Sequence, residues 1–71
     1  MTDTKLLNAK IEKSGLKKQY IAVRCGITYQ ALLNKINNKS DFTAPEIKML
    51  RALLNLTAEE VELIFFTIDV E

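Results

Sequence analysis

The side chains best suited to chemistry in this sequence are the amides Gln30, Asn34 and Asn37, whose spacing places them on one side of a helix. An amide can donate and accept a hydrogen bond at the same time, which suits it to the adenine edge in the major groove of DNA. Tyr29 and Leu33 flank this stripe. A helix that only covers a core more often carries Glu and Lys at such positions. We therefore expect Tyr29, Gln30 and Asn34 to contact bases.

The stripe lies in a segment with the spacing of a helix-turn-helix, at about residues 17–37. A short helix is expected over about 17–25, and Gly26 ends it because glycine adopts the left-handed conformation readily. Thr28 is then the N-cap of a second helix over about 28–37. Its exposed side carries the amides.

Three further helices are expected from local signals. The first covers about 4–13. Two capping boxes, Thr43-Ala44-Pro45-Glu46 and Thr57-Ala58-Glu59-Glu60, predict helices over about 44–55 and 58–67. A chain of 71 residues is short for more than one domain. The prediction is therefore an all-α, compact five-helix bundle that forms a single domain over residues 1–71.

The charge is distributed unevenly along the chain. Residues 1–39 hold eight Lys and Arg against two Asp and Glu, a net charge of +6, whereas residues 40–71 carry −5. This asymmetry predicts a basic face for a polyanion and an acidic remainder that points away from it. In particular, Lys18 and Lys39 are candidates for contact with phosphate. The alternative is that both halves only solvate the surface.

Composition argues against several other classes of protein. One cysteine and no histidine provide no zinc ligand set, and no arrangement of residues suggests catalysis, so we expect no metal, no cofactor and no enzyme. Cys25 is expected to be a small apolar residue. The start of the chain lacks an apolar signal core, and no apolar run could span a membrane. A cytoplasmic location is expected.

The helix-turn-helix segment also resembles a known family. The pattern Ala22-x-x-x-Gly26-Ile27-Thr28, continuing to Leu32 and Lys35-Ile36-Asn37-Asn38, resembles the lambda-repressor-like helix-turn-helix family. Within it, the chain is similar to small phage Cro-type and repressor-like regulators of Gram-positive bacteria. The resemblance implies the compact fold of that family and a transcriptional regulator that binds an operator in double-stranded DNA.

The resemblance also implies roles for individual residues. Thr28 would cap the recognition helix and touch a phosphate, and Asn37 would contact the DNA backbone. Tyr29, Gln30 and Asn34 occupy the base-contacting positions of the family. Lys18 stands where the family usually has a glutamine that contacts phosphate, so the contact remains possible with different hydrogen-bonding geometry. Leu33 departs from the polar residue that is common there, and it would meet a thymine methyl group or be partly buried.

The sequence leaves open how many copies act together and whether the main partner is DNA or a protein. One recognition helix covers only a few base pairs, so a homodimer on two half-sites is expected. The expected dimer surface lies in the acidic C-terminal third, at Val61, Phe65, Phe66 and Ile68, although the two phenylalanines would also suit a core. The alternative function is a small helical protein-interaction module, or an antitoxin whose main partner is a protein. The near-zero net charge slightly favours this alternative.

Overall fold

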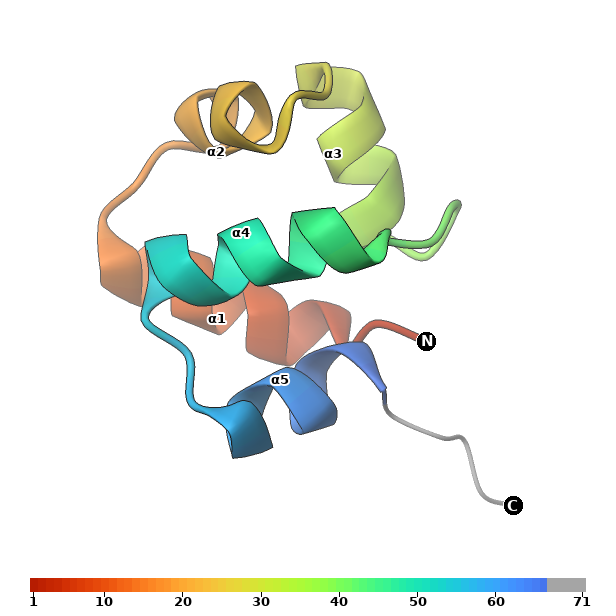
Figure 1. The fold of residues 1–71 in the computed structure, drawn as a ribbon. Helices are drawn as coiled ribbons and strands as arrows, with labels where there is room; N and C mark the ends of the chain where they lie inside the picture. Colours follow the sequence, from red (N-terminus) through yellow and green to blue (C-terminus); the bar gives the residue numbers. More distant parts are fainter. Residues whose placement is uncertain (67–71) are drawn as a thin grey trace.

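A computed structural model of the chain describes residues 1–66, and this part folds into five helices without strands (Figure 1). The α1 and α4 helices lie between the α2–α3 pair at one end of the molecule and α5 at the other. Each observed helix begins and ends within two residues of the boundaries predicted from the sequence. The helices are α1 (Thr4–Ser14), α2 (Lys18–Cys25), α3 (Tyr29–Ile36), α4 (Ala44–Leu54) and α5 (Ala58–Phe65).

Side-chain caps fix the N-terminal ends of four helices. The Thr28 hydroxyl accepts a hydrogen bond from the backbone N–H of Ala31 at 3.0 Å, as predicted for the start of α3. Both predicted capping boxes are confirmed, since Thr43 and Thr57 exchange hydrogen bonds with the residues three positions later. Asp3 caps α1 in the same way. Each cap contributes about 1 kcal/mol to stability.

Left-handed residues end three helices by the same hydrogen-bonding scheme. Gly26 follows α2 with φ 74°, Asn38 follows α3 with φ 64°, and Asn55 follows α4 with φ 54°. In each case the next backbone N–H bonds to the carbonyl five residues earlier, as in a Schellman motif. The sequence predicted this role for Gly26 but not for the two asparagines.

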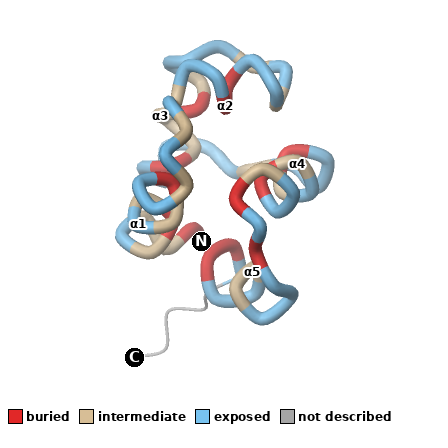
Figure 2. Tube along the Cα trace, turned by 90° about the vertical axis from the view of Figure 1, so that its left-hand side faces the viewer, coloured by how far each residue is buried: buried red, intermediate tan, exposed pale blue. Residues whose placement is uncertain are grey.

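All five helices contribute buried residues to one core (Figure 2). Apolar residues recur every three or four positions along α4 and α5, and among them Ile47, Leu53 and Val61 are only half-buried. Phe42, which precedes α4, packs edge-on against Phe65 with ring centroids 5.4 Å apart. The fully buried side chains are Leu7, Ile21, Leu32, Ile36, Leu50 and Ile64.

The first residues of the chain join the ends of α3 and α5. The Asn38 amide accepts from the backbone N–H of Thr2 and donates to its carbonyl, both at 2.8 Å. The Thr4 hydroxyl donates to the carbonyl of Ile36 at 2.6 Å. The backbone N–H of Asp3 donates to the carbonyl of Ile64 at 2.7 Å. The end of α3 is therefore held to the N-terminal segment.

The structure corrects part of the expected dimer surface. Phe65 is only 6% exposed and belongs to the core, because its position on α5 faces Phe42. Phe66 is 53% exposed, Val61 is half-buried, and Ile68 lies outside the described residues. Among residues 1–66, no helix combines the length and apolar composition that crossing a membrane requires.

Candidate nucleic-acid interface

The α2 and α3 helices pack together across a turn of three residues. Gly26 donates to the carbonyl of Val23 and Ile27 donates to that of Ala22, each at 3.0 Å. Ala22 is buried, and Ile27 packs against the core. The turn therefore fixes α3 relative to α2 through backbone bonds and apolar contact together. This geometry leaves the outer side of α3 uncovered by α2.

The predicted amide stripe lies on that outer side. Gln30 is exposed and Asn34 is half-buried, and the Gln30 Nε2 donates to the Asn34 Oδ1 at 3.1 Å. Tyr29, the first residue of α3, is 42% exposed beside them. Leu33 is half-buried. Neither amide is turned into the core, so the structure brings the three predicted base-contacting residues onto one accessible surface.

The four residues predicted to contact the DNA backbone lie at the start of α2, at the start of α3 and after the end of α3. Lys18 is the first residue of α2 and is half-buried beside α1. Thr28 is exposed, with its hydroxyl engaged in the cap. Asn37 and Lys39 are both exposed after the end of α3, where the backbone N–H of Lys39 bonds to the carbonyl of Asn34 at 2.8 Å. Lysines thus lie at the start of α2 and beyond the end of α3.

Lys35 is the basic residue of α3 itself, but the structure ties it to α4. Its Nζ lies 2.8 Å from the Glu46 Oε1 and 3.0 Å from the carbonyl of Asp41. Burial acts to raise the pKa of Glu46, but the hydrogen bonds from Lys35 and the Thr43 N–H outweigh it and lower that pKa below its ordinary value. Lys35 therefore joins α3 to the capping box of α4.

Sequence reasoning missed a pair of side chains on the outer side of α2. The Arg24 guanidinium donates to the Tyr20 hydroxyl at 2.8 Å, and its central carbon lies 5.8 Å from the centre of the Tyr20 ring. Tyr20 is 45% exposed. An aromatic residue four positions before an arginine is the signal that predicts such a pair on a helix. The contact presents a cation and a phenol together at the surface.

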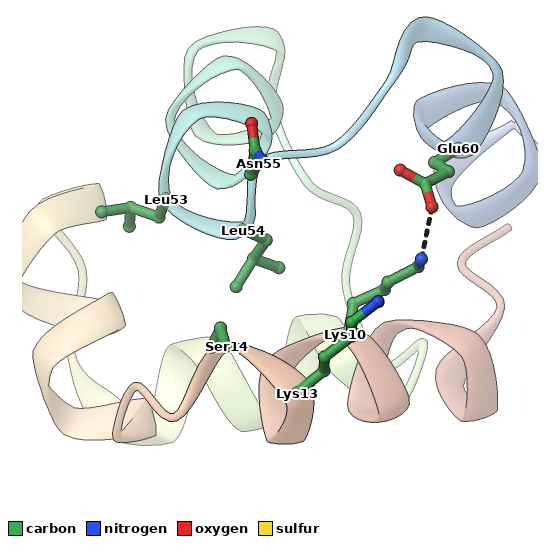
Figure 3. A pocket seen from close by; sticks show the side chains of 7 residues that line it. All are labelled: Lys10, Lys13, Ser14, Leu53, Leu54, Asn55 and Glu60. Atoms are coloured by element: carbon green, nitrogen blue, oxygen red, sulfur yellow. Dashed lines mark hydrogen bonds and ion pairs between the residues drawn. The ribbon is translucent and has the colours of Figure 1, made fainter.

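A cavity of about 360 Å³ lies on another side of the molecule, between α1, the end of α4 and the start of α5 (Figure 3). An ion pair between Lys10 and Glu60 closes one side of it. The hydrogen bond from Lys10 lowers the pKa of Glu60, so this carboxylate remains ionised. The Ser14 hydroxyl in the wall donates to the carbonyl of Ile11. In this cavity the Glu60 carboxylate is paired with Lys10, and the Ser14 hydroxyl is bonded to the backbone.

Burial raises the pKa of the Cys25 thiol, which makes the reactive thiolate less available. Within residues 1–66, no group of three His, Cys, Asp or Glu side chains could hold a metal ion. Comparison with known protein families, curated proteins and solved structures finds no match for this chain.

Proposed function

We propose that the chain is a sequence-specific transcriptional regulator that binds double-stranded DNA and reads the major groove with α3. In this proposal the five helices form a bundle of the lambda-repressor-like type, as in small phage repressors of the Cro type. The observation that carries it is the placement of Gln30 and Asn34 together on the accessible side of a helix that follows a tight turn. A short amide-bearing helix of this kind suits the width of the major groove.

The hydrogen bond between the two amides supports base reading. Because the Gln30 Nε2 already donates to the Asn34 Oδ1, the Gln30 Oε1 and the Asn34 Nδ2 remain to accept and donate outward. One acceptor beside one donor matches the N6 and N7 groups of adenine. Each amide also holds the other in place, so less side-chain freedom is lost on binding. Tyr29 would contact a thymine methyl group or a phosphate at the start of α3.

The basic residues would supply affinity that does not depend on sequence. Lys18 and Lys39 would neutralise phosphates on either side of the groove, while Thr28 and Asn37 would donate to the DNA backbone. Among residues 1–66, the two ion pairs engage Lys10 and Lys35, so these two cations are assigned no phosphate. Two copies on neighbouring half-sites would give useful specificity.

The test separates base contacts from phosphate contacts. A duplex selected by the wild type from a random pool is compared with a scrambled duplex, using fluorescence anisotropy to measure the dissociation constants. We expect Gln30→Ala to cost about 1–3 kcal/mol on the selected duplex and to relax specificity at one position. On the scrambled duplex this variant should bind as the wild type does.

Lys18→Ala should instead weaken binding to both duplexes by the same factor. Lys13→Ala removes the same charge from the cavity of Figure 3 and is the matched control, with little expected effect. If the Gln30 and Lys18 variants both lost the same affinity on both duplexes, the assignment of base reading to α3 would be wrong.

A second candidate is a helical protein-interaction module, including an antitoxin that binds a protein. The exposed Phe66 and the acidic α5 favour it, because a protein partner could contact an apolar ring and a charged helix at this surface. The salt dependence of duplex binding separates the two candidates.

A further inference from the structure

An apolar groove lies between α4 and the end of α5, with a volume of about 330 Å³. Phe42, Ile47 and Val61 are half-buried in its walls. Phe66 also lines it and remains 53% exposed, although it follows directly on the buried Phe65. An exposed aromatic ring beside an apolar hollow is typical of a surface that binds another protein. The volume is at the lower end of the range for ligand pockets, so the groove has room for a few side chains.

The charged residues that line this groove are all basic. Lys48 and Arg51 lie one helical turn apart on α4, and no Asp or Glu is among the lining residues. Both are exposed, and among residues 1–66 neither takes part in an ion pair. They are also the only basic residues of residues 40–71, which together carry a net charge of −5. Two cations without ion-pair partners make this groove a positive site in an otherwise acidic region, and such a site attracts an anion.

The apolar walls and the two cations together select the kind of anion. A phosphate backbone or a small inorganic anion would leave the apolar walls without contacts. A second copy of the chain, facing the groove across a two-fold axis, would bring the same two cations, so like charges would meet. A peptide segment that carries apolar side chains next to carboxylates is complementary to both parts of the groove.

We propose that the groove binds a short acidic segment of another protein. Two large apolar side chains of this segment pack against Val61 and Phe66, and at least two of its Asp or Glu carboxylates lie beside the cations of α4. The planar guanidinium of Arg51 takes one carboxylate through two parallel hydrogen bonds, and the ammonium group of Lys48 takes the other.

This inference goes beyond the proposed function and does not depend on it. None of the residues assigned to DNA lines the groove, so a duplex and the acidic segment can be bound at the same time. Val61 and Phe66 belong to the surface that the sequence assigned to a homodimer. In this proposal a different protein takes the place of the second copy there.

The first test identifies which peptides the intact chain selects. A display library of random peptides of about 12 residues is enriched on the immobilised full chain without DNA, and the strongest binders are remade with a fluorescent label. We expect these peptides to share at least two acidic and two large apolar residues. Their dissociation constants, measured by fluorescence anisotropy, should be micromolar, because the contact is small. No enrichment, or enrichment of neutral or basic peptides only, would overturn the inference.

Two pairs of charge reversals then locate the binding site. Lys48→Glu with Arg51→Glu should weaken binding of the selected acidic peptide by about tenfold or more, because like charges then face each other. Lys5→Glu with Lys13→Glu makes the same change in net charge at exposed positions of α1 outside the groove, so it is the matched control and should have little effect. Equal losses in the two double variants would show that the peptide responds only to net charge, which would reject the site.

A charge exchange in the peptide provides the rescue. A peptide in which Lys replaces each Asp and Glu should bind the variant with Lys48→Glu and Arg51→Glu more tightly than it binds the wild type. The opposite order of affinities would contradict a contact between the carboxylates and these two cations.

The apolar part of the groove is tested at two exposed residues near the end of α5. Phe66→Ser should weaken binding of the acidic peptide by about tenfold or more. Leu63 is 60% exposed on α5 but does not line the groove, so Leu63→Ser is the matched control and should bind as the wild type does. If Phe66→Ser does not fold, the charge reversals still decide the question.

Sedimentation equilibrium of the chain alone tests the other occupant. A dimer that is lost in Phe66→Ser and kept in Leu63→Ser would mean that a second copy fills the groove, and the inference would be wrong.

These measurements distinguish the groove from the proposed DNA-binding surface. Peptide binding is measured without DNA, whereas the DNA contacts are tested with Gln30 and Lys18, which lie outside the groove. A chain that binds the acidic peptide but no duplex would support the groove and reject the regulator. A chain that binds a duplex but selects no acidic peptide would reject the groove alone.

Discussion

Lys35 shows that a basic residue on the candidate recognition helix can bind within the fold instead of being free to contact DNA. In the sequence it contributes to the net positive charge of residues 1–39. In the structure its ammonium group bonds to the carboxylate of Glu46 and to the backbone carbonyl of Asp41. Both side chains of the pair are largely shielded from water, at 14% and 11% exposure. The pair therefore connects α3 to α4, and the folded state depends on the charge of Glu46.

Because the folded state depends on this charge, the contribution of Glu46 to stability should decrease at low pH. The pKa of Glu46 is lower in the folded state than its ordinary value of 4.5, so the unfolded state takes up a proton first as the pH falls. The stabilisation is complete above pH 4.5 and is lost as the pH falls from there through the folded-state pKa. Glu46→Gln should be about 1–2 kcal/mol less stable than the wild type at pH 7.

Urea unfolding at pH 7 and at pH 3 measures the effect. The difference in free energy of unfolding between wild type and Glu46→Gln should narrow at pH 3, because below the ordinary pKa of 4.5 the unfolded wild type has already taken up a proton at this carboxyl. Glu12→Gln removes an exposed carboxylate of α1 and is the control. A difference that stays constant between the two pH values would show that the charge of Glu46 does not contribute.

Sequence reasoning succeeded at single residues where the side chain acts locally. The placement of Gln30 and Asn34 together on one side of α3, outside the core, followed from helical spacing alone. The attachment of Lys35 to Glu46 did not follow, because it joins residues of two helices whose relative placement depends on the whole core. The Tyr20 and Arg24 pair was local and could have been found from its spacing.

At the scale of helices, the starts were easier to predict than the ends. Thr43 and Thr57 begin capping boxes whose partners lie three residues away, so the sequence contains the complete signal. Asn38 and Asn55 end α3 and α4 in the left-handed conformation. Asparagine tolerates this conformation but does not require it, so its presence alone did not predict where the helices end.

The two asparagines should respond in opposite ways to glycine. Asn55→Gly relieves the left-handed conformation and should stabilise the fold by about 0.5 kcal/mol. Asn38→Gly gains the same relief but loses two hydrogen bonds to the backbone of Thr2, so it should destabilise by about 1 kcal/mol. Thermal unfolding monitored by circular dichroism measures both. Equal effects of the two substitutions would contradict the role given to the Asn38 amide.

At the scale of the whole molecule, the packing of one helix against another was beyond the sequence. Apolar periodicity indicated which side of each helix faces inward, and the fully buried residues lie on those sides. Periodicity does not identify the partner, so the bonds of Thr2 with Asn38 and of Asp3 with Ile64 were not foreseen. The burial of Phe65 beside an exposed Phe66 likewise depends on how α5 lies against Phe42.

The charge of the whole molecule gives a further prediction. If Lys18 and Lys39 contact one phosphate each, the logarithm of the binding constant should fall with the logarithm of salt concentration with a slope of about −2 for each bound copy. Anisotropy titrations from about 50 to 200 mM salt measure this slope, and Lys18→Ala should reduce it by about one. A protein-interaction module should bind no duplex even at the lowest salt concentration.

The bond between Asp3 and Ile64 has a consequence for how the chain could be rearranged. It brings the beginning of α1 and the end of α5 within hydrogen-bonding distance of each other. A short linker could therefore join the two into a closed ring, and the ring could be reopened between the exposed Lys39 and Ser40. Such a circular permutant would begin with α4 and finish with α3 while keeping the same core, and it would place the amide-bearing helix beside a newly made free end.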